Sequence, residues 1–203
     1  MAPKVKLTYF NLRGRGEAAR LLLAYGGIEY EDCRINPAFV DNAEWMELKP
    51  TTPYGSLPLL EWNGVVLAQS LAIARFVAKE VGLAGRNPLE CAQVDEIVDA
   101  VNDMLVAGSK AMFSNDEEQM KKYFTESLPH SLGQLEKRLI GRGGQYFVGN
   151  SISWADVQLY SFCSGLQDQS CLHKVPKIKN LMDRVGNIPN IKAWVEKRPV
   201  TPM

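Results

Sequence analysis

The sequence predicts two domains of different class: an α/β domain over residues 1–81 and an all-helical domain over residues 87–203, with a linker at residues 82–86. Two observations lead to this prediction. The first part of the chain holds short strand-like segments and one strong hairpin signal, whereas the part after the linker repeats its apolar residues only at helical spacing. The chain length of 203 residues is enough for two small domains with proper cores.

The first domain is expected to open with a strand, a helix and a second strand. Val5–Phe10 alternates apolar and polar residues as a strand does, and residues 11–16 form a loop. Glu17–Tyr25 carries its apolar residues on one helical face, and Gly26-Gly27 ends this helix. Residues 28–35 then form the second strand. Two strands joined by a helix form a right-handed parallel crossover by default.

A hairpin completes the predicted sheet. Asn63-Gly64 lies between two apolar runs and favours a two-residue type I′ turn, so Leu57–Trp62 and Val65–Ala68 should pair as antiparallel strands. Pro58 fits near the start of the first of these strands, at an edge or an end of the sheet, with a prolyl bond that is either cis or trans. Residues 36–52 contain two prolines and are expected to be irregular.

Gln69-Ser70 opens a further helix, in which Leu71, Ala74, Val77 and Val81 recur at helical spacing. Its N-terminus favours a carboxylate, and the free backbone groups of Leu57 could pair with an extended peptide. The order β-α-β, then β-β-α, is the thioredoxin-like arrangement, with Pro58 where that fold carries its cis-proline. No C-x-x-C follows the first strand, which excludes disulfide exchange as the activity.

The second domain is expected to begin at Asn87-Pro88-Leu89-Glu90, which reads as an N-cap, a proline at the first helical position and a glutamate in the first turn. Ser153-Trp154-Ala155-Asp156 is a capping box, a common feature that is purely structural by itself. The core stripe of the first helix comprises Val94, Ile97, Val98, Val101 and Leu105, and later helices are expected over residues 117–140, 153–167, 177–186 and 191–197.

Composition and charge indicate which partners, cellular location and metal or disulfide sites to expect. The formal charge is zero and no run of basic residues with interleaved aromatics occurs, so neither nucleic acid nor a membrane is expected as a partner. No signal peptide or membrane-spanning stretch is recognised, and we expect a cytoplasmic protein. Four scattered cysteines and two histidines suggest no zinc site, no other metal and no disulfide framework.

Four motifs are the most specific: Leu7-Thr8-Tyr9-Phe10-Asn11-Leu12-Arg13-Gly14-Arg15, Gln69-Ser70-Leu71-Ala72-Ile73-Ala74-Arg75, Ile97-Val98-Asp99 and Lys197-Arg198-Pro199. Together with the capping box after Tyr146-Phe147-Val148-Gly149-Asn150, they resemble the sigma class of cytosolic glutathione transferases, a class related to glutathione-dependent prostaglandin D synthases. The resemblance covers essentially the full length. It implies the glutathione transferase fold, a homodimer, and glutathione as cosubstrate in detoxifying apolar electrophiles, with organic peroxide reduction as a further activity.

That reaction requires a thiol largely ionised near neutral pH, although a free thiol has a pKa of about 8.5. Lowering the pKa by about two units takes roughly 2.7 kcal/mol, and a hydrogen bond to a charged group contributes about 1.5 to 3 kcal/mol. The resemblance assigns the hydroxyl donor to Tyr9 and the supporting cation to Arg15. The competing interpretation of Tyr9 is an aromatic core residue at a strand end.

The resemblance also assigns residues to the parts of glutathione. Trp45 and Lys49 would hold the glycyl end, Leu57 the cysteinyl backbone, and Gln69 with Ser70 the γ-glutamyl carboxylate. Asp103 would meet the γ-glutamyl ammonium across the dimer interface. Without the resemblance, the preferred interpretation of Asp95, Asp99 and Asp103 is a helix face exposed to solvent. A site for a divalent ion is the least favoured interpretation of these three residues. The full glutathione-binding set is Tyr9, Arg15, Trp45, Lys49, Ser56, Leu57, Pro58, Gln69, Ser70 and Asp103.

An apolar electrophile pocket is expected beside this site. The residues implied for it are Phe10, Leu12, Gly14, Met104, Gly108, Phe162 and Met203. Three departures from the family pattern stand out: the segment 35–44 is longer than usual before Trp45, Ser56 replaces a larger polar residue, and Lys110 stands where some prostaglandin D synthases carry an aromatic residue. Alternatives to conjugation are a glutathione-dependent prostaglandin-type isomerase and a non-catalytic relative that stores ligands or serves structurally.

Overall fold

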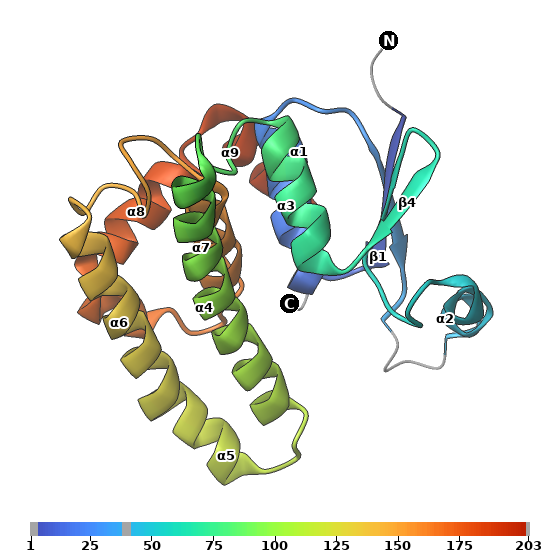
Figure 1. The fold of residues 1–203 in the computed structure, drawn as a ribbon. Helices are drawn as coiled ribbons and strands as arrows, with labels where there is room; N and C mark the ends of the chain where they lie inside the picture. The colour runs from blue at the N-terminus through green and yellow to red at the C-terminus, as the bar shows by residue number, and fades with distance from the viewer. Residues whose placement is uncertain (1–3, 38–41, 202–203) are drawn as a thin grey trace. The chain divides into compact units, whose positions relative to one another are not determined.

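The computed structural model describes residues 4–37 and 42–201, which form two compact units (Figure 1). The first unit holds the described residues up to Gly82 together with those from Ile188 onward, and the second unit holds Leu83–Asn187. The last helix therefore groups with the first unit by its contacts, although the sequence prediction places it at the end of the helical domain. The predicted domain boundaries stay a prediction, since packing units and family domains are defined differently.

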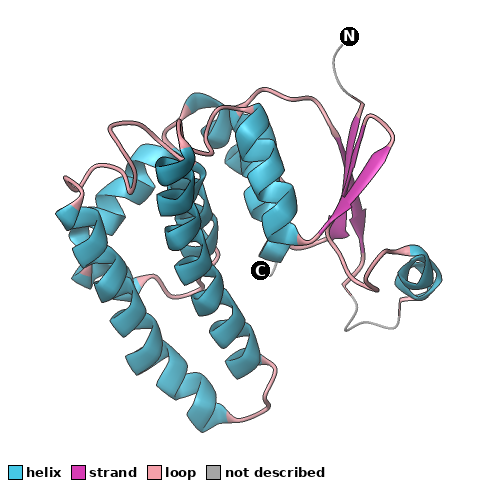
Figure 2. Ribbon diagram, in the orientation of Figure 1, coloured by secondary structure: helices cyan, strands magenta, loops and turns pink. Residues whose placement is uncertain are grey.

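The first unit is built on a four-stranded sheet in the order β2-β1-β3-β4 (Figure 2). β1 (Val5–Phe10) pairs in parallel with β2 (Glu31–Ile35) and antiparallel with β3 (Leu59–Trp62), which continues through the Asn63-Gly64 turn into β4 (Val65–Ala68). Both turn residues have positive φ, 50° and 85°, as a type I′ turn requires. The predicted thioredoxin-like order is confirmed, and the Leu57–Pro58 bond is cis.

The first unit also contains helices α1 (Glu17–Tyr25), α3 (Ser70–Glu80) and α9 (Pro189–Lys197), and α1 packs against both of the others. A short 3-10 turn at Gly14–Gly16 leads directly into α1. Of the apolar residues predicted for one face of α3, Ala74 and Val77 are buried, whereas Leu71 and Val81 are partly exposed. In α1, every residue from Glu17 to Leu23 is buried, so burial is not confined to one face. The core residues without exposed surface include Leu7, Leu21, Leu22, Leu60, Ile73 and Val77.

One segment corrects the sequence prediction. Residues 36–52 were expected to be irregular, but they contain α2 (Ala43–Leu48) and a 3-10 turn (Lys49–Thr51). The side chain of Asn42 caps α2 by accepting a hydrogen bond from the Trp45 N–H at 3.2 Å. The two prolines masked this helix in the sequence, since a helix of six residues has little periodicity of its own. Residues 38–41 of the same segment lie outside the described part.

The second unit is helical. Its elements are α4 (Pro88–Met112), α5 (Glu117–Lys122), a π-helical segment (Tyr123–Ser127), α6 (Leu128–Gly141), α7 (Trp154–Ser164), a 3-10 segment (Ser170–Lys174) and α8 (Pro176–Gly186). α7 packs against α4 and α8. The Asn87 cap is confirmed, because its side chain accepts from the Glu90 N–H at 2.9 Å. In the predicted core stripe of α4, four residues are buried and Leu105 is partly exposed.

The predicted capping box at the start of α7 is confirmed. Asp156 is fully buried and accepts hydrogen bonds from the Ser153 N–H at 2.7 Å and the Ser153 hydroxyl at 2.8 Å. Its other oxygen accepts from the Phe147 N–H at 3.0 Å, which ties the preceding loop to the helix. None of the helices in residues 4–37 and 42–201 has the length and apolar character that a membrane crossing requires.

Candidate functional site

Tyr9 lies near the end of β1 with only 6% of its surface exposed. It belongs to a buried cluster with Leu12, Ile35, Trp45 and Leu57, against which the partly buried Phe10 packs. The ring of Phe10 meets that of Trp45 edge-on, with 5.2 Å between the centroids. The structure thus gathers several residues predicted for the site, and the longer segment before Trp45 has not moved its side chain out of this cluster.

The loop after β1 wraps closely around the Tyr9 ring. A Cβ on Gly16 would lie 2.5 Å from Tyr9 Cδ1, and a Cβ on Gly14 would lie 2.8 Å from the Tyr9 hydroxyl oxygen. Gly14 also has a φ of 36°, a conformation that side chains rarely adopt. Glycine is therefore required at both positions if the backbone is to lie this close to the ring.

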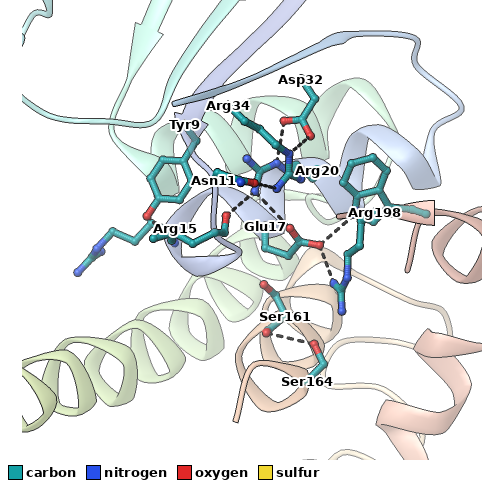
Figure 3. A network of polar contacts seen from close by, with 12 residues as sticks. Tyr9, Asn11, Arg15, Glu17, Arg20, Asp32, Arg34, Ser161, Ser164 and Arg198 are labelled. Atoms are coloured by element: carbon teal, nitrogen blue, oxygen red, sulfur yellow. Dashed lines mark hydrogen bonds and ion pairs between the residues drawn. The ribbon is translucent and has the colours of Figure 1, made fainter. Parts of the chain in front are cut away.

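The Tyr9 hydroxyl is held by the backbone of Arg15. Its oxygen accepts a hydrogen bond from the Arg15 N–H at 3.1 Å, and the Arg15 side chain extends away from it (Figure 3). Burial raises the pKa of Tyr9 above its usual value, while the Arg15 N–H and the charges of Arg15 and Arg20 act in the opposite direction. Tyr9 is therefore a neutral phenol near pH 7. Within the described residues, no acceptor engages its O–H, which can donate to a ligand.

A group of buried and partly buried charged side chains lies beside Tyr9 in the first unit (Figure 3). It is called here the Arg20 network and comprises Glu17, Arg20, Asp32, Arg34 and Arg198. Arg20 has no exposed surface, and its guanidinium carbon lies 5.7 Å from the centroid of the Tyr9 ring. Its Nε donates to Asp32 at 2.9 Å and its Nη1 donates to the Leu12 carbonyl at 2.8 Å. Asp32 also accepts from Arg34 at 2.7 Å. The network therefore joins α1, β2 and the loop around Tyr9.

Glu17 connects the same network to α9. This carboxylate is 1% exposed, and one of its oxygens lies 3.4 Å from Arg20 Nη1. Its other oxygen accepts from the Trp194 indole N–H at 2.9 Å and from Arg198 at 2.7 Å. The last helix, more than 170 positions away in sequence, is thus fixed to the start of α1.

The remaining predicted site residues of the first unit lie on the 3-10 turn after α2, in the loop before β3 and at the start of α3. Leu57 is buried, while Lys49 and Ser56 are exposed and accessible to a ligand. Gln69 is exposed and has a φ of 73°, although it is not a glycine. Such strained residues cluster at ligand sites, which fits the predicted role of Gln69 beside the first residue of α3.

The second unit carries four of the predicted site residues. Asp103 is exposed on α4, and Phe162 on α7 is partly buried. Met104 and Gly108 are buried against Tyr123, whose hydroxyl donates to the Met104 carbonyl at 2.8 Å. Met203 lies outside the described residues. In the described part of the chain, no three His, Cys, Asp or Glu side chains gather as a metal site would require.

The Arg20 network is not among the features that the sequence predicts. Its one visible signal was the placement of Glu17 and Arg20 on α1, three residues apart on a helix that is otherwise apolar. Charged residues on such a helix are usually assigned to the solvated face, and nothing local distinguishes these two. Their partners Asp32, Trp194 and Arg198 come from distant segments, so pairing them requires the fold.

Two models of known protein families match this chain, one in its N-terminal part and one in its C-terminal part. Residues 5–79 match the family model described as the N-terminal domain of glutathione S-transferase, and residues 102–198 match the model of its C-terminal domain. The hematopoietic prostaglandin D synthase of Gallus gallus is 42% identical over 208 residues, which cover 98% of each chain. Glutathione S-transferase 1 of Ascaris suum is 39% identical, over 98% of this chain and 99% of its own.

The solved structures agree with this. The structure of rat hPGDS complexed with a quinoline superposes with a TM-score of 0.89 and 38% identity, and the match covers 98% of this chain and all of the rat chain. Identity at this level over both parts is far above the range in which only the fold is shared.

Proposed function

The chain belongs to the glutathione S-transferase family, and we propose that it is a sigma-class enzyme that conjugates glutathione to apolar electrophiles. The observation that carries the proposal is the Tyr9 hydroxyl, which accepts from the Arg15 N–H and keeps its own O–H to donate. The class assignment is supported by the motifs around Tyr9 and Gln69.

In the proposed mechanism, the thiol of bound glutathione releases its proton to solvent, and the Tyr9 O–H donates to the sulfur and stabilises the resulting thiolate. The raised pKa of Tyr9 suits this role, because the phenol keeps its proton and acts as a donor rather than as a base. The thiolate then attacks the electrophilic carbon and forms an S–C bond, while the leaving group departs with its electron pair. Arg15 and Arg20 add positive charge beside the developing reaction.

Glutathione is proposed to bind along the elements that surround Tyr9. The exposed Lys49 would hold the glycyl carboxylate, and the backbone of Leu57 would pair with the cysteinyl residue. Gln69 and Ser70 would bind the γ-glutamyl carboxylate, since Ser70 is the first residue of α3 and helix N-termini offer unpaired N–H groups. Trp45, Ser56 and Pro58 are proposed to shape the same site.

A homodimer is proposed, in which the exposed Asp103 of one subunit meets the γ-glutamyl ammonium in the other. Sedimentation of the chain tests the oligomeric state, and Asp103→Asn should raise the KM for glutathione without changing that state. The proposed electrophile pocket comprises Phe10, Leu12, Gly14, Met104, Gly108, Phe162 and Met203. Organic peroxide reduction and a cytoplasmic location remain proposals of the same kind.

A second candidate is the synthesis of prostaglandin D, because two of the reported relatives carry that name or its abbreviation. This activity would use glutathione without consuming it. Incubation with prostaglandin H and a count of the glutathione consumed per product separates the two candidates. Lys110, which stands where some prostaglandin D synthases have an aromatic residue, argues for conjugation as the principal activity.

The experiment that tests the proposed mechanism is Tyr9→Phe. Loss of the hydroxyl should lower kcat for conjugation about 100-fold, the typical cost of losing one donor to a developing anion, and leave glutathione affinity within about threefold. Tyr30→Phe is the matched control, since this partly buried tyrosine packs on Trp194 in the same unit but does not belong to the Tyr9 cluster. Unchanged turnover in Tyr9→Phe would remove Tyr9 from its role.

A further inference from the structure

Arg20 has an unusual set of partners for a helical residue. Its guanidinium is fully buried, yet it bonds to a carboxylate on β2 and to a carbonyl in the loop around Tyr9. A buried charge costs free energy unless its partners compensate for desolvation, and replacement by apolar groups is often neutral. Burial of Arg20 is therefore not explained by stability alone, and the carbonyl to which Arg20 donates indicates what else it does.

That carbonyl belongs to Leu12, in the middle of the segment that joins Tyr9 to the backbone N–H of Arg15. The segment is also anchored near its start, where the Asn11 N–H donates to the Ile35 carbonyl at 2.6 Å and Arg34 donates to the Asn11 side chain at 3.3 Å. Beyond Leu12, the next anchor is the bond from the Glu17 N–H to the Arg13 carbonyl. Leu12 itself makes a backbone bond, from its N–H to the Phe10 carbonyl at 2.7 Å, which lies within the same loop. Arg20 thus supplies a side-chain contact that ties the centre of the loop to α1.

We propose that Arg20 is a positioning residue for thiolate formation: it holds the Leu12 carbonyl so that the Arg15 N–H stays on the Tyr9 hydroxyl. This inference rests on the proposed function of Tyr9. The Arg15 N–H polarises the phenol, because hydrogen bonds in a chain strengthen one another, and it also directs the free O–H of Tyr9. A loop that moved away would leave Tyr9 a weaker and less well aligned donor.

The planar guanidinium is needed for this task, and its charge alone does not suffice. Asp32 binds Nε while Nη1 reaches Leu12, so the two bonds fix the plane of the group and its direction at once. Glu17 lies beside the same Nη1 and Arg34 shares Asp32. A lysine would keep the charge but offers one point of attachment in place of a rigid fork.

The test is Arg20→Lys, with Arg198→Gln as the matched control. Arg198 bonds to Glu17 in the same network but does not bond to the loop around Tyr9 in the described structure. We expect Arg20→Lys to lower kcat about tenfold and to raise the pKa of bound glutathione by about one unit, with the KM for glutathione within about twofold. Arg198→Gln should lose thermal stability while its kcat and thiol pKa stay at the parent values.

The proposal is overturned if Arg20→Lys keeps the parent kcat and thiol pKa and loses stability alone. If Arg20→Lys does not fold, the same measurements on Asp32→Asn test the proposal. This variant removes the carboxylate that orients Arg20 Nε and leaves Arg20 in place. A raised thiol pKa in Asp32→Asn supports positioning, and an unchanged pKa contradicts it. The parent enzyme distinguishes a failure of the proposed function from a failure of this inference: if the thiol of glutathione bound to the parent shows no lowered pKa, it is the proposed function of Tyr9 that fails.

Discussion

Glu17 in the first unit and Asp156 in the second are both buried carboxylates at the start of a helix, but their partners differ in kind. Glu17 is contacted by Arg20, Arg198 and the Trp194 indole. Asp156 accepts from the Phe147 N–H and from the N–H and hydroxyl of Ser153, all neutral donors. Burial raises the pKa of Asp156 above its usual range, against the effect of those hydrogen bonds.

The difference indicates what each carboxylate does. Asp156 satisfies its own helix end and one loop, which is a local structural task. Glu17 balances cations that extend to the ring of Tyr9, so a change at Glu17 can reach the proposed chemistry. Substitutions in the two places should therefore separate stability from turnover.

Glu17→Gln should have the largest effect. Removal of one partner from a buried ion network typically costs about 3 to 5 kcal/mol. Here Arg198 would lose the carboxylate that it binds at 2.7 Å, and Arg20 would keep Asp32 as its carboxylate partner. We expect a loss of unfolding free energy of this order, measured by urea denaturation, and a lower kcat per folded molecule. A variant that is destabilised but turns over like the parent would limit Glu17 to a structural role.

Asp156→Asn should cost less and affect only folding. The amide keeps one acceptor oxygen but turns its N–H₂ toward donors, which leaves buried groups unpaired at a cost of about 1 to 3 kcal/mol. Denaturation measures the loss, and kcat corrected for the folded fraction is expected to match the parent. A specific loss of turnover would show that the second unit is coupled to the reaction through this helix end.

Gly16→Ala tests the close contact around Tyr9. Because the new Cβ would lie 2.5 Å from Tyr9 Cδ1, the ring or the loop must shift, and a displacement of this size can lower kcat by about 10- to 100-fold. Gly133→Ala is the control, since a Cβ there meets nothing within 4 Å and α6 should gain about 0.5 to 1 kcal/mol from alanine. Parent-like turnover in Gly16→Ala would mean that the ring position is not critical.

The pH dependence follows from the direction of the Tyr9 shift. A folded-state pKa above the ordinary value of about 10 means that the phenol stays protonated to higher pH in the folded protein. Any stability that the protonated phenol contributes is fully present below the unfolded-state pKa of about 10, and it is lost as pH rises through the higher folded-state pKa. We expect kcat/KM to show no decline due to Tyr9 below about pH 10. A decline near pH 9 that disappears in Tyr9→Phe would contradict this.

The sequence predicted the fold well because its signals are local. The Asn63-Gly64 turn, the Asn87 cap and the Ser153-Asp156 box each depend on residues a few positions apart, and each is confirmed. Helix α2 was missed because it is short. The cluster of Tyr9, Trp45 and Leu57 was implied by the family resemblance alone, and the Arg20 network could not be predicted, since it joins residues from both ends of the chain.

The most direct test of the account is the pKa of the thiol of bound glutathione, measured by ultraviolet difference spectroscopy over a pH series with the parent and Tyr9→Phe. We expect the thiol pKa in the parent to lie about two units below the free-thiol reference of about 8.5, and to return toward 8.5 in Tyr9→Phe. A parent value close to 8.5, or a lowered value that Tyr9→Phe leaves in place, would contradict thiolate activation by Tyr9.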